Sequence, residues 1–112
     1  MLHITRDFPG QTVITTFETS PGLCADLLDA LVEAYADFIR HQPGFLSAAL
    51  HVNDAQTRIA NYSRWRRRED FQAMLRSPEM RVRNRRFMEL CSRFEPVMYE
   101  VAEVVGAPES AG

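Results

Sequence analysis

The order in which hydrophobic periodicity changes along the chain is the feature that most limits its fold. Residues alternate with a period of two over 12–18, 45–52, 58–65 and 97–105, which is typical of strands. Apolar residues recur every three or four positions after the first and third of these segments, as in amphipathic helices. The resulting order, β-α-β-β-α-β, predicts an α+β, ferredoxin-like (split β-α-β) fold. Such a fold has a four-stranded antiparallel sheet with its helices on one face.

Local signals predict where the helices begin and end. The first is expected to run from the capping residue Ser20 to His41, before a Pro-Gly pair stops it. A short helix over 69–75 and a longer one over 78–94 follow the third strand, separated by the proline after Ser77. We expect the two strands over 45–52 and 58–65 to form a hairpin, because an Asn-Asp pair supplies turn residues between them.

The size and composition of the chain predict one soluble domain. Its 112 residues are too few to divide between two cores, and 46% hydrophobic with 25% charged residues is ordinary for globular proteins. We expect the domain core at about 12–105 and a flexible tail at 106–112. Neither a membrane-spanning segment nor a signal peptide is recognisable, so the predicted location is the cytoplasm, without a membrane partner.

Basic residues are concentrated in the middle of the chain, and all of them are arginine. Residues 58–93 hold eleven Arg and four acids, a sum of +7, whereas the segments before and after it sum to −5 and −4. A basic segment can bind nucleic acid, but the chain as a whole is acidic, at −2, and carries no recognition motif. We therefore expect a solvated or partner-paired face and no nucleic-acid partner.

Residues that bind metals or cofactors form no recognisable motif. Cys24 and Cys91 lie in helical patterns and are predicted to be core residues rather than a disulfide. His3, His41 and His51 are far apart in the sequence and lack metal-ligand spacing. Glycine-rich nucleotide loops and the nucleophile elbow of serine hydrolases are also missing. The sequence predicts neither a metal site nor a cofactor.

The strand over 58–65 has bulky residues on both faces. Ile59 and Trp65 lie on one face, and Ala60 and Tyr62 lie on the other. One face of a ferredoxin-like sheet carries no helix, and one domain of this length has no further element to cover it. We therefore predict a homodimer in which two sheets pack face to face as a dimeric barrel. Each subunit would keep a cavity between its sheet and its own helices.

Asn61 and Trp65 are the main candidates for a functional site. They share one face of the predicted strand, with side chains about 13 Å apart along it. The single Trp can simply fill the core at the end of the strand. A carboxamide on the helix-facing side is costly to bury without partners, so Asn61 must bond to protein, water or a ligand.

Two short motifs resemble a known family. Pro43-Gly44-Phe45, followed in register by Asn61-Tyr62-x-x-Trp65, is similar to the antibiotic biosynthesis monooxygenase domain. The similarity is strongest to the cofactor-independent, anthrone-oxidising monooxygenases of aromatic polyketide biosynthesis. This resemblance implies a dimeric ferredoxin-like barrel that oxidises a phenolic aromatic substrate with O2, without flavin, haem or metal. It also implies that Asn61 and Trp65 are the catalytic residues.

The chemistry implied by this resemblance gives each residue a role. A substrate carbanion would reduce O2 directly, and the peroxide formed would lose water to give a quinone. The Asn61 amide would stabilise the enolate oxygen, and Trp65 would hold the flat ring system. Some anthrone oxidases have a Tyr where this chain has Phe71. The residues expected to contact the substrate are Phe71, His51, Ser63 and Arg85.

Other functions are compatible with the same scaffold. A quinol monooxygenase acting in redox defence is the nearest enzymatic alternative. A non-catalytic, small-molecule-binding dimeric barrel is the other, because a fold does not determine a function. Haem degradation is disfavoured, because the resembling enzymes place a His on the helix after the Asn/Trp pair. This chain has no His after His51.

Overall fold

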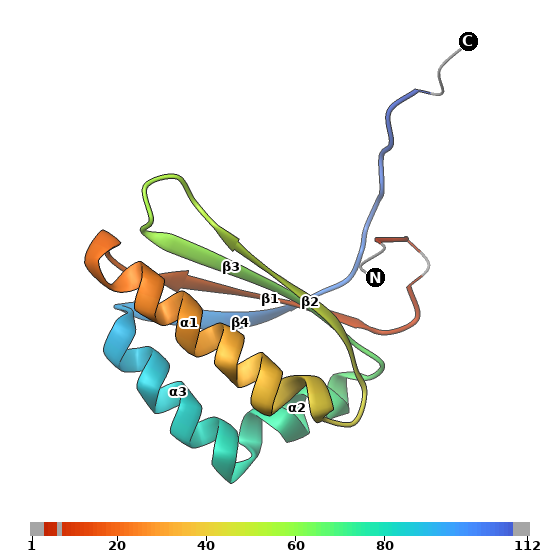
Figure 1. The fold of residues 1–112 in the computed structure, drawn as a ribbon. Helices are drawn as coiled ribbons and strands as arrows, with labels where there is room; N and C mark the ends of the chain where they lie inside the picture. The colour runs from red at the N-terminus through yellow and green to blue at the C-terminus, as the bar shows by residue number, and fades with distance from the viewer. Residues whose placement is uncertain (1–3, 7, 109–112) are drawn as a thin grey trace.

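The computed structural model describes residues 4–6 and 8–108, and it confirms the ferredoxin-like fold. The four strands are hydrogen-bonded in the order β2-β3-β1-β4, and every neighbouring pair is antiparallel. Figure 1 shows the path of the chain through these elements. Their bounds are β1 Gln11–Glu18, α1 Pro21–Asp37, the 3-10 helix η1 Ile39–His41, β2 Phe45–Val52, β3 Arg58–Trp65, α2 Arg68–Arg76, α3 Pro78–Leu90 and β4 Arg93–Tyr99.

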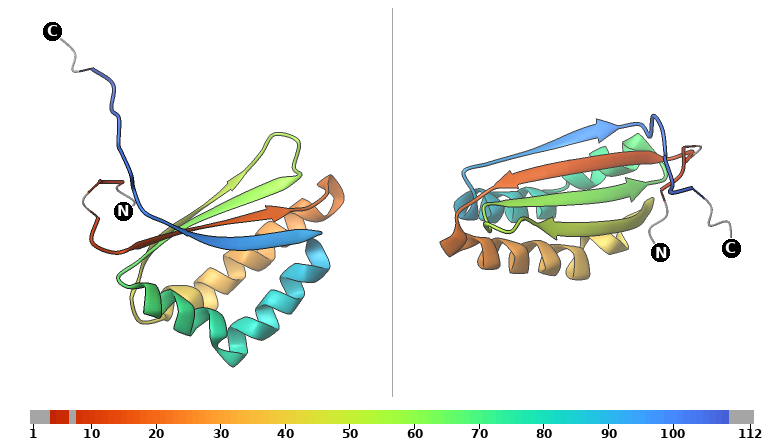
Figure 2. Two further views of the ribbon diagram at one scale, coloured as in Figure 1. Left: turned by 180° about the vertical axis from the view of Figure 1, so that it is seen from behind. Right: turned by 90° about the horizontal axis from the view of Figure 1, so that it is seen from above.

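The helices cover one face of the sheet and leave the other face bare, as Figure 2 shows. The core lies between the two layers because alternate residues of the central strands point toward the helices. Val13, Phe17 and Ile59 come from the sheet, and Leu27 and Leu31 of α1 meet them; all five are at most 2% exposed. Burying each such side chain contributes about 1.5–3 kcal/mol to folding, so this layer contact is the main source of stability.

The first helix is shorter than the sequence predicts. It ends at Asp37 rather than at His41, because Phe38 leaves the helical conformation (φ −137°). A 3-10 turn, η1, follows and carries the predicted last residues. This change of direction buries Ile39 in the core. At the other end Ser20 occupies the N-cap position with extended backbone, but its side chain makes no capping hydrogen bond.

The predicted end of α3 and the predicted last strand are wrong. The helix ends at Leu90 instead of residue 94, and β4 spans Arg93–Tyr99 instead of 97–105. Two hydrogen bonds with the end of β1 and the residue after it hold the chain in this arrangement. The Thr19 hydroxyl donates to Leu90 O (2.6 Å), and Ser92 N donates to Glu18 O (2.8 Å). The backbone is therefore extended four residues before the expected start of the strand.

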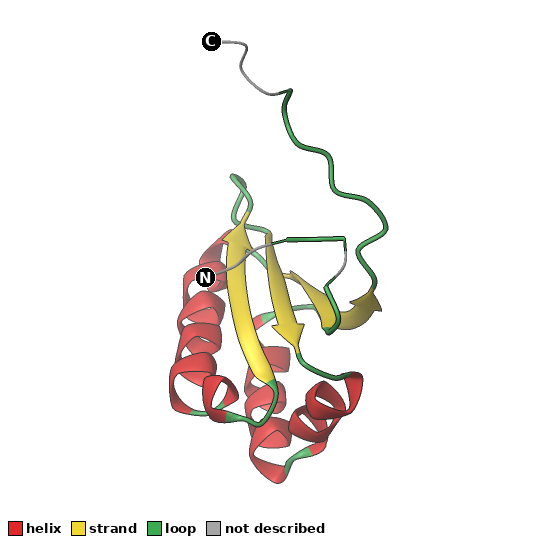
Figure 3. Cartoon of the chain, turned by 90° about the vertical axis from the view of Figure 1, so that its right-hand side faces the viewer, coloured by secondary structure: helices red, strands yellow, loops and turns green. Residues whose placement is uncertain are grey.

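Two residues of β4 explain why the strand is stable there. Phe94 stacks on Phe17 with ring centroids 5.1 Å apart. It therefore packs against the core from β4, although the sequence predicted it at the end of the preceding helix. Pro96 lacks a backbone donor, but β4 is an edge strand, where proline is tolerated. Beyond Tyr99, residues 100–108 have no regular secondary structure and run away from the sheet (Figure 3). The rest of the predicted tail, 109–112, lies outside the described residues.

The bare face is not wholly uncovered within one chain. Arg64 of β3 lies on this face, and its guanidinium sits 3.9 Å from the centroid of the Phe8 ring. Phe8, which precedes β1, therefore covers part of this face, which the sequence did not predict. No helix lies over the middle of this face (Figure 2).

Several sequence-based expectations about charge and cysteine agree with the structure. Five arginines of the basic segment 58–93 form ion pairs with Asp or Glu in the described part of the chain, which fits a solvated, paired face. Cys24 is buried, Cys91 is half-buried, and both are free thiols.

In residues 4–6 and 8–108, no three His, Cys, Asp or Glu side chains are grouped as a metal site would require. Over the same residues no helix is long and apolar enough to cross a membrane.

Candidate active site

A small cavity lies between the sheet and the helices, where the sequence predicted one. About 40 Å³ of it is free space. Side chains from β1, β3, α1, α2, α3 and β4 enclose it, so every layer of the fold contributes. The lining is mostly apolar, and its polar members are Thr15, Tyr35, Asn61, Ser63 and Asn84.

The register of the sheet brings Asn61 to this cavity. It lies in the middle of β3, between Thr15 of β1 and Leu50 of β2, and is 9% exposed. Its Oδ1 accepts a hydrogen bond of 2.8 Å from the Tyr35 hydroxyl of α1. Among the described residues this is the side-chain hydrogen bond that Asn61 makes, and the amide nitrogen donates to none of them. The carboxamide therefore has a bonded acceptor end and a free donor end.

Tyr35 keeps its proton throughout the physiological range. Burial raises the pKa of the Tyr35 phenol to about 12, because the phenolate would lose its hydration, while the Asn61 and Ser63 side chains act in the opposite direction. At neutral pH the phenol is therefore a neutral hydrogen-bond donor. It is also the only titratable side chain among the residues that line the cavity.

Trp65 forms an aromatic wall at the end of β3. It is 1% exposed and makes edge contacts with Phe45 (centroids 5.4 Å apart) and Phe71 (5.7 Å). Its indole Nε1 donates to Ser63 Oγ at 3.2 Å, and Ser63 Oγ donates to Val13 O at 3.4 Å. Because the protein already uses the indole N–H, Trp65 offers the cavity an apolar ring rather than a donor.

Four of the six predicted site residues come together at the cavity. Asn61, Ser63, Trp65 and Phe71 all line it. Their burial alone would also suit a structural role, so the predicted catalytic and binding roles remain predictions. The sequence did not assign a role to Thr15, Tyr35 or Asn84. Tyr35 follows the buried Leu31 by four residues, and Asn84 follows the buried Met80 by four, so helical spacing is the signal that indicates an inward position for both.

The structure does not bring His51 and Arg85 to this cavity. His51 pairs with Ala60 and therefore lies on the bare face of the sheet, where it is exposed. Arg85 is exposed on α3, and the preceding Asn84 lines the cavity in its place, because one residue turns a helix by about 100°. With His51 on the far face, no described His lines the cavity, so the haem alternative lacks a ligand there.

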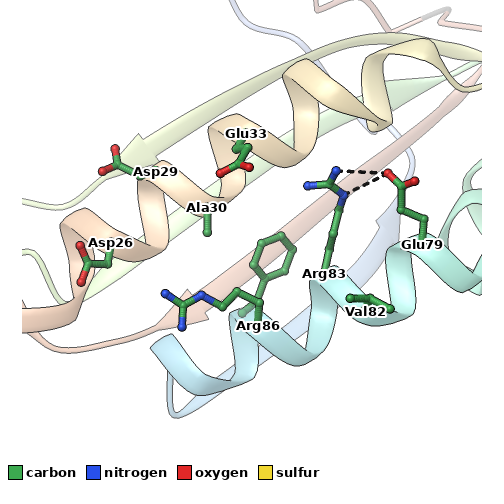
Figure 4. A pocket seen from close by; sticks show the side chains of 9 residues that line it. Asp26, Asp29, Ala30, Glu33, Glu79, Val82, Arg83 and Arg86 are labelled. Carbon is green, nitrogen blue, oxygen red and sulfur yellow. Dashed lines mark hydrogen bonds and ion pairs between the residues drawn. The ribbon is translucent and has the colours of Figure 1, made fainter.

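A second hollow, a groove of about 590 Å³, lies on the outside between α1 and α3 (Figure 4). Its α1 side carries Asp26, Asp29 and Glu33, and its α3 side carries arginines. Arg83 is held by Glu79, with both nitrogen-to-oxygen distances at 3.2 Å. Phe87 lines both this groove and the inner cavity, so its ring separates the two spaces.

The fold and this cavity define a class of protein: a small ferredoxin-like α+β domain with a mostly apolar pocket between its sheet and helices. The family model described as antibiotic biosynthesis monooxygenase matches residues 11–86. Tetracenomycin-F1 monooxygenase of Streptomyces glaucescens is 34% identical over 101 residues, which cover 90% of this chain and 89% of that protein. The chain belongs to the antibiotic biosynthesis monooxygenase family.

Solved structures confirm the fold at lower sequence identity. A mutant of SnoaB, a cofactor-independent oxygenase from Streptomyces nogalater, matches with a TM-score of 0.76 at 17% identity, covering 88% of this chain and 99% of that one. The ActVA-Orf6 monooxygenase of Streptomyces coelicolor, in complex with nanaomycin D, matches with a TM-score of 0.77 at 20% identity. That match covers 88% of this chain and 93% of the other.

Proposed function

We propose that this chain is a cofactor-independent monooxygenase that oxidises an anthrone-like aromatic polyketide, or a similar polycyclic phenol, to a quinone with O2. Family membership and the tetracenomycin-F1 monooxygenase relative support the reaction class. One observation carries the assignment of the site: the Asn61 carboxamide lines an aromatic-walled cavity, and its hydrogen bond to Tyr35 uses the oxygen rather than the nitrogen. In this proposal the N–H groups face the substrate. Neutral donors of this kind stabilise negative charge that develops on a substrate oxygen.

The proposed reaction balances without any group beyond substrate and O2. Loss of a proton from the methylene carbon of an anthrone gives a carbanion delocalised onto the carbonyl oxygen. This anion transfers one electron to O2, and the two radicals combine to form a C–O bond and a peroxide. After protonation the peroxide loses water as the second C–H bond breaks, which leaves the quinone. One O2 is consumed, one of its atoms enters the product and the other leaves as water.

In this proposal Asn61 stabilises the anion and does not remove the proton. A carboxamide is not a base, and Tyr35 remains protonated because its pKa is raised to about 12. The other residues lining the cavity are not titratable, and His51 lies on the opposite face of the sheet. The proton therefore passes to water or to a dissolved base. The Asn61 N–H groups lower the cost of that step by binding the enolate oxygen.

The cavity must expand to accept such a substrate. Pockets for ligands of this size have volumes of about 300–1,000 Å³, far more than the 40 Å³ found here. Met74, Leu75 and Met80 line the side formed by α2 and the start of α3. Methionine side chains are unbranched and adapt readily, so this wall is the one we expect to move. The rigid sheet side, with Asn61 and Trp65, would stay in place.

We also propose that the bare sheet face forms a homodimer. Ile14, Ala60 and Tyr62 are half-buried on this face, and Val97 is 36% exposed beside them. The Tyr62 hydroxyl oxygen is buried but has no hydrogen-bond partner among the described residues, which is costly unless another molecule supplies one. Packing two such faces would bury above about 2,000 Å² in total, as in obligate dimers.

Oxygen consumption with an anthrone tests the proposed reaction. We expect the purified protein to consume one O2 per anthrone oxidised, and to place one labelled atom in the quinone when 18O2 is used. Its absorption spectrum should show no flavin or haem band, and a chelator should leave the rate unchanged. Anthrone binding without turnover would favour the non-catalytic binding module. Turnover of simple quinols but not of anthrones would favour the redox-defence enzyme.

A further inference from the structure

The phenol of Tyr35, a half-buried residue, has no part in the reaction described above, yet it bonds to Asn61. We propose that Tyr35 is a positioning residue: its hydroxyl holds the Asn61 carboxamide with the N–H end toward the cavity. This inference rests on the proposed function, because it concerns the donor that stabilises the substrate anion. The observation behind it is the 2.8 Å hydrogen bond from the Tyr35 hydroxyl to Asn61 Oδ1.

A carboxamide can offer a ligand either of two opposite ends. Rotation by about 180° about its last side-chain bond exchanges the oxygen, an acceptor, with the nitrogen, a donor of two hydrogens. An acceptor facing the cavity would repel an enolate oxygen. The bond from Tyr35 occupies the Asn61 oxygen, and in this proposal it leaves the nitrogen as the end that meets the substrate. Helix α1 therefore determines which end of a β3 side chain meets the substrate.

The same bond makes the amide a better donor. A phenol that donates to the carboxamide oxygen draws electron density away from the nitrogen, and linked hydrogen bonds strengthen each other by about 10–30%. Burial supports this role, because the pKa of Tyr35, about 12, keeps the hydroxyl proton in place at every working pH. A phenolate could not donate, and the amide would then turn its N–H groups toward it.

The Tyr35 ring also packs against Phe45, with centroids 5.8 Å apart, so a purely structural role must be separated from positioning. Tyr35→Phe keeps the ring and this contact but removes the hydroxyl. We expect kcat to fall roughly 10-fold with KM little changed, which is the scale of one lost hydrogen bond. Ser20→Ala, which removes an exposed hydroxyl that makes no capping hydrogen bond at the start of the same helix, is the control and should leave both constants unchanged.

Combining the substitutions distinguishes positioning from packing. If Tyr35 acts only through Asn61, the Tyr35→Phe/Asn61→Ala double variant should turn over at the same rate as Asn61→Ala alone. A purely structural loss would multiply with that of Asn61→Ala instead. Either a multiplicative loss or full activity in Tyr35→Phe would overturn the proposal and leave the monooxygenase assignment intact.

A spectroscopic measurement keeps the test independent of turnover. The side-chain amide signals of Asn61 can be assigned by their loss in Asn61→Ala with 15N NMR. They should shift in Tyr35→Phe and stay in place in Ser20→Ala. If the wild type fails to oxidise any anthrone, the proposed function fails, and these signals still decide the positioning. Unshifted Asn61 signals in Tyr35→Phe would overturn the positioning itself.

Discussion

Replacing Gly44 with alanine should destabilise the protein because two features of the structure require glycine there. Its φ of +82° is in the left-handed region, which costs a residue with a side chain about 1–2 kcal/mol. A methyl group on Gly44 would also overlap the Asp70 carboxylate of α2 and lie 2.6 Å from Asp70 Cβ. The backbone cost alone is therefore a minimum, and displacement of Asp70 adds to it.

The overlap matters to the site because Gly44 contacts both the residue after β3 and the first turn of α2. Gly44 O accepts a hydrogen bond of 2.8 Å from Arg66 N, next to Trp65, and Asp70 is held by Arg67 (2.9 and 3.2 Å). Moving Asp70 shifts the first turn of α2, which carries Phe71 to the edge of the Trp65 ring. We therefore expect a change in the aromatic wall as well as a loss of stability.

Thermal and urea unfolding at one fixed protein concentration measure the effect. A loss of 1–2 kcal/mol corresponds to a Tm lower by about 3–10 °C for a domain of this size. Gly22→Ala is the matched control, because a methyl group on Gly22 meets no atom within 4 Å and its position is in α1. It should leave the Tm unchanged or slightly higher. Equal stability of the two glycine variants would refute this account of Gly44.

Two further substitutions test the proposed dimer and the aromatic wall. Tyr62→Asp should dissociate the dimer or unfold the protein, because it buries an unpaired charge on the bare face. Asn61→Ala, on the opposite face of β3, should leave the dimer intact. Sedimentation at micromolar concentration measures both, and a wild type that sediments as a monomer would contradict the dimer. Trp65→Phe keeps a flat apolar ring but loses area, and its N–H is already bonded to Ser63, so KM should rise more than kcat falls in steady-state oxidation. A loss confined to kcat would instead indicate a specific role for the indole.

The sequence predicts the hairpin well because its signals are local. Alternation over 45–52 and 58–65, with turn residues between, gives β2 and β3 with their observed bounds. The start of β4 was missed because Phe94 fits both a helical stripe and a strand. Whether a helix or a strand forms there depends on hydrogen bonds to β1 and Thr19, about 75 residues earlier in the chain. Local hydrophobic periodicity carries no information about such distant partners.

The candidate site was predicted in part, for a related reason. Asn61, Ser63 and Trp65 share a face of one strand, so period-two alternation is enough to group them. A bulge between Phe45 and Ser47 breaks that alternation in β2, which brings Phe45 to Trp65 while His51 lies on the bare face. Tyr35 was missed because its partner Asn61 is 26 residues away, across the contact between helix and sheet. Strand pattern and helical phase do not determine such contacts.

The rate of anthrone oxidation by Asn61→Ala tests the central claim most directly. Oxygen uptake under saturating anthrone should show kcat lower by on the order of 10²-fold, the effect of removing one oxyanion donor, with the fold and dimer unchanged. The Ser20→Ala control should keep the wild-type rate. An Asn61→Ala protein that retains full kcat and the wild-type fold would contradict the proposal that this amide stabilises the substrate anion.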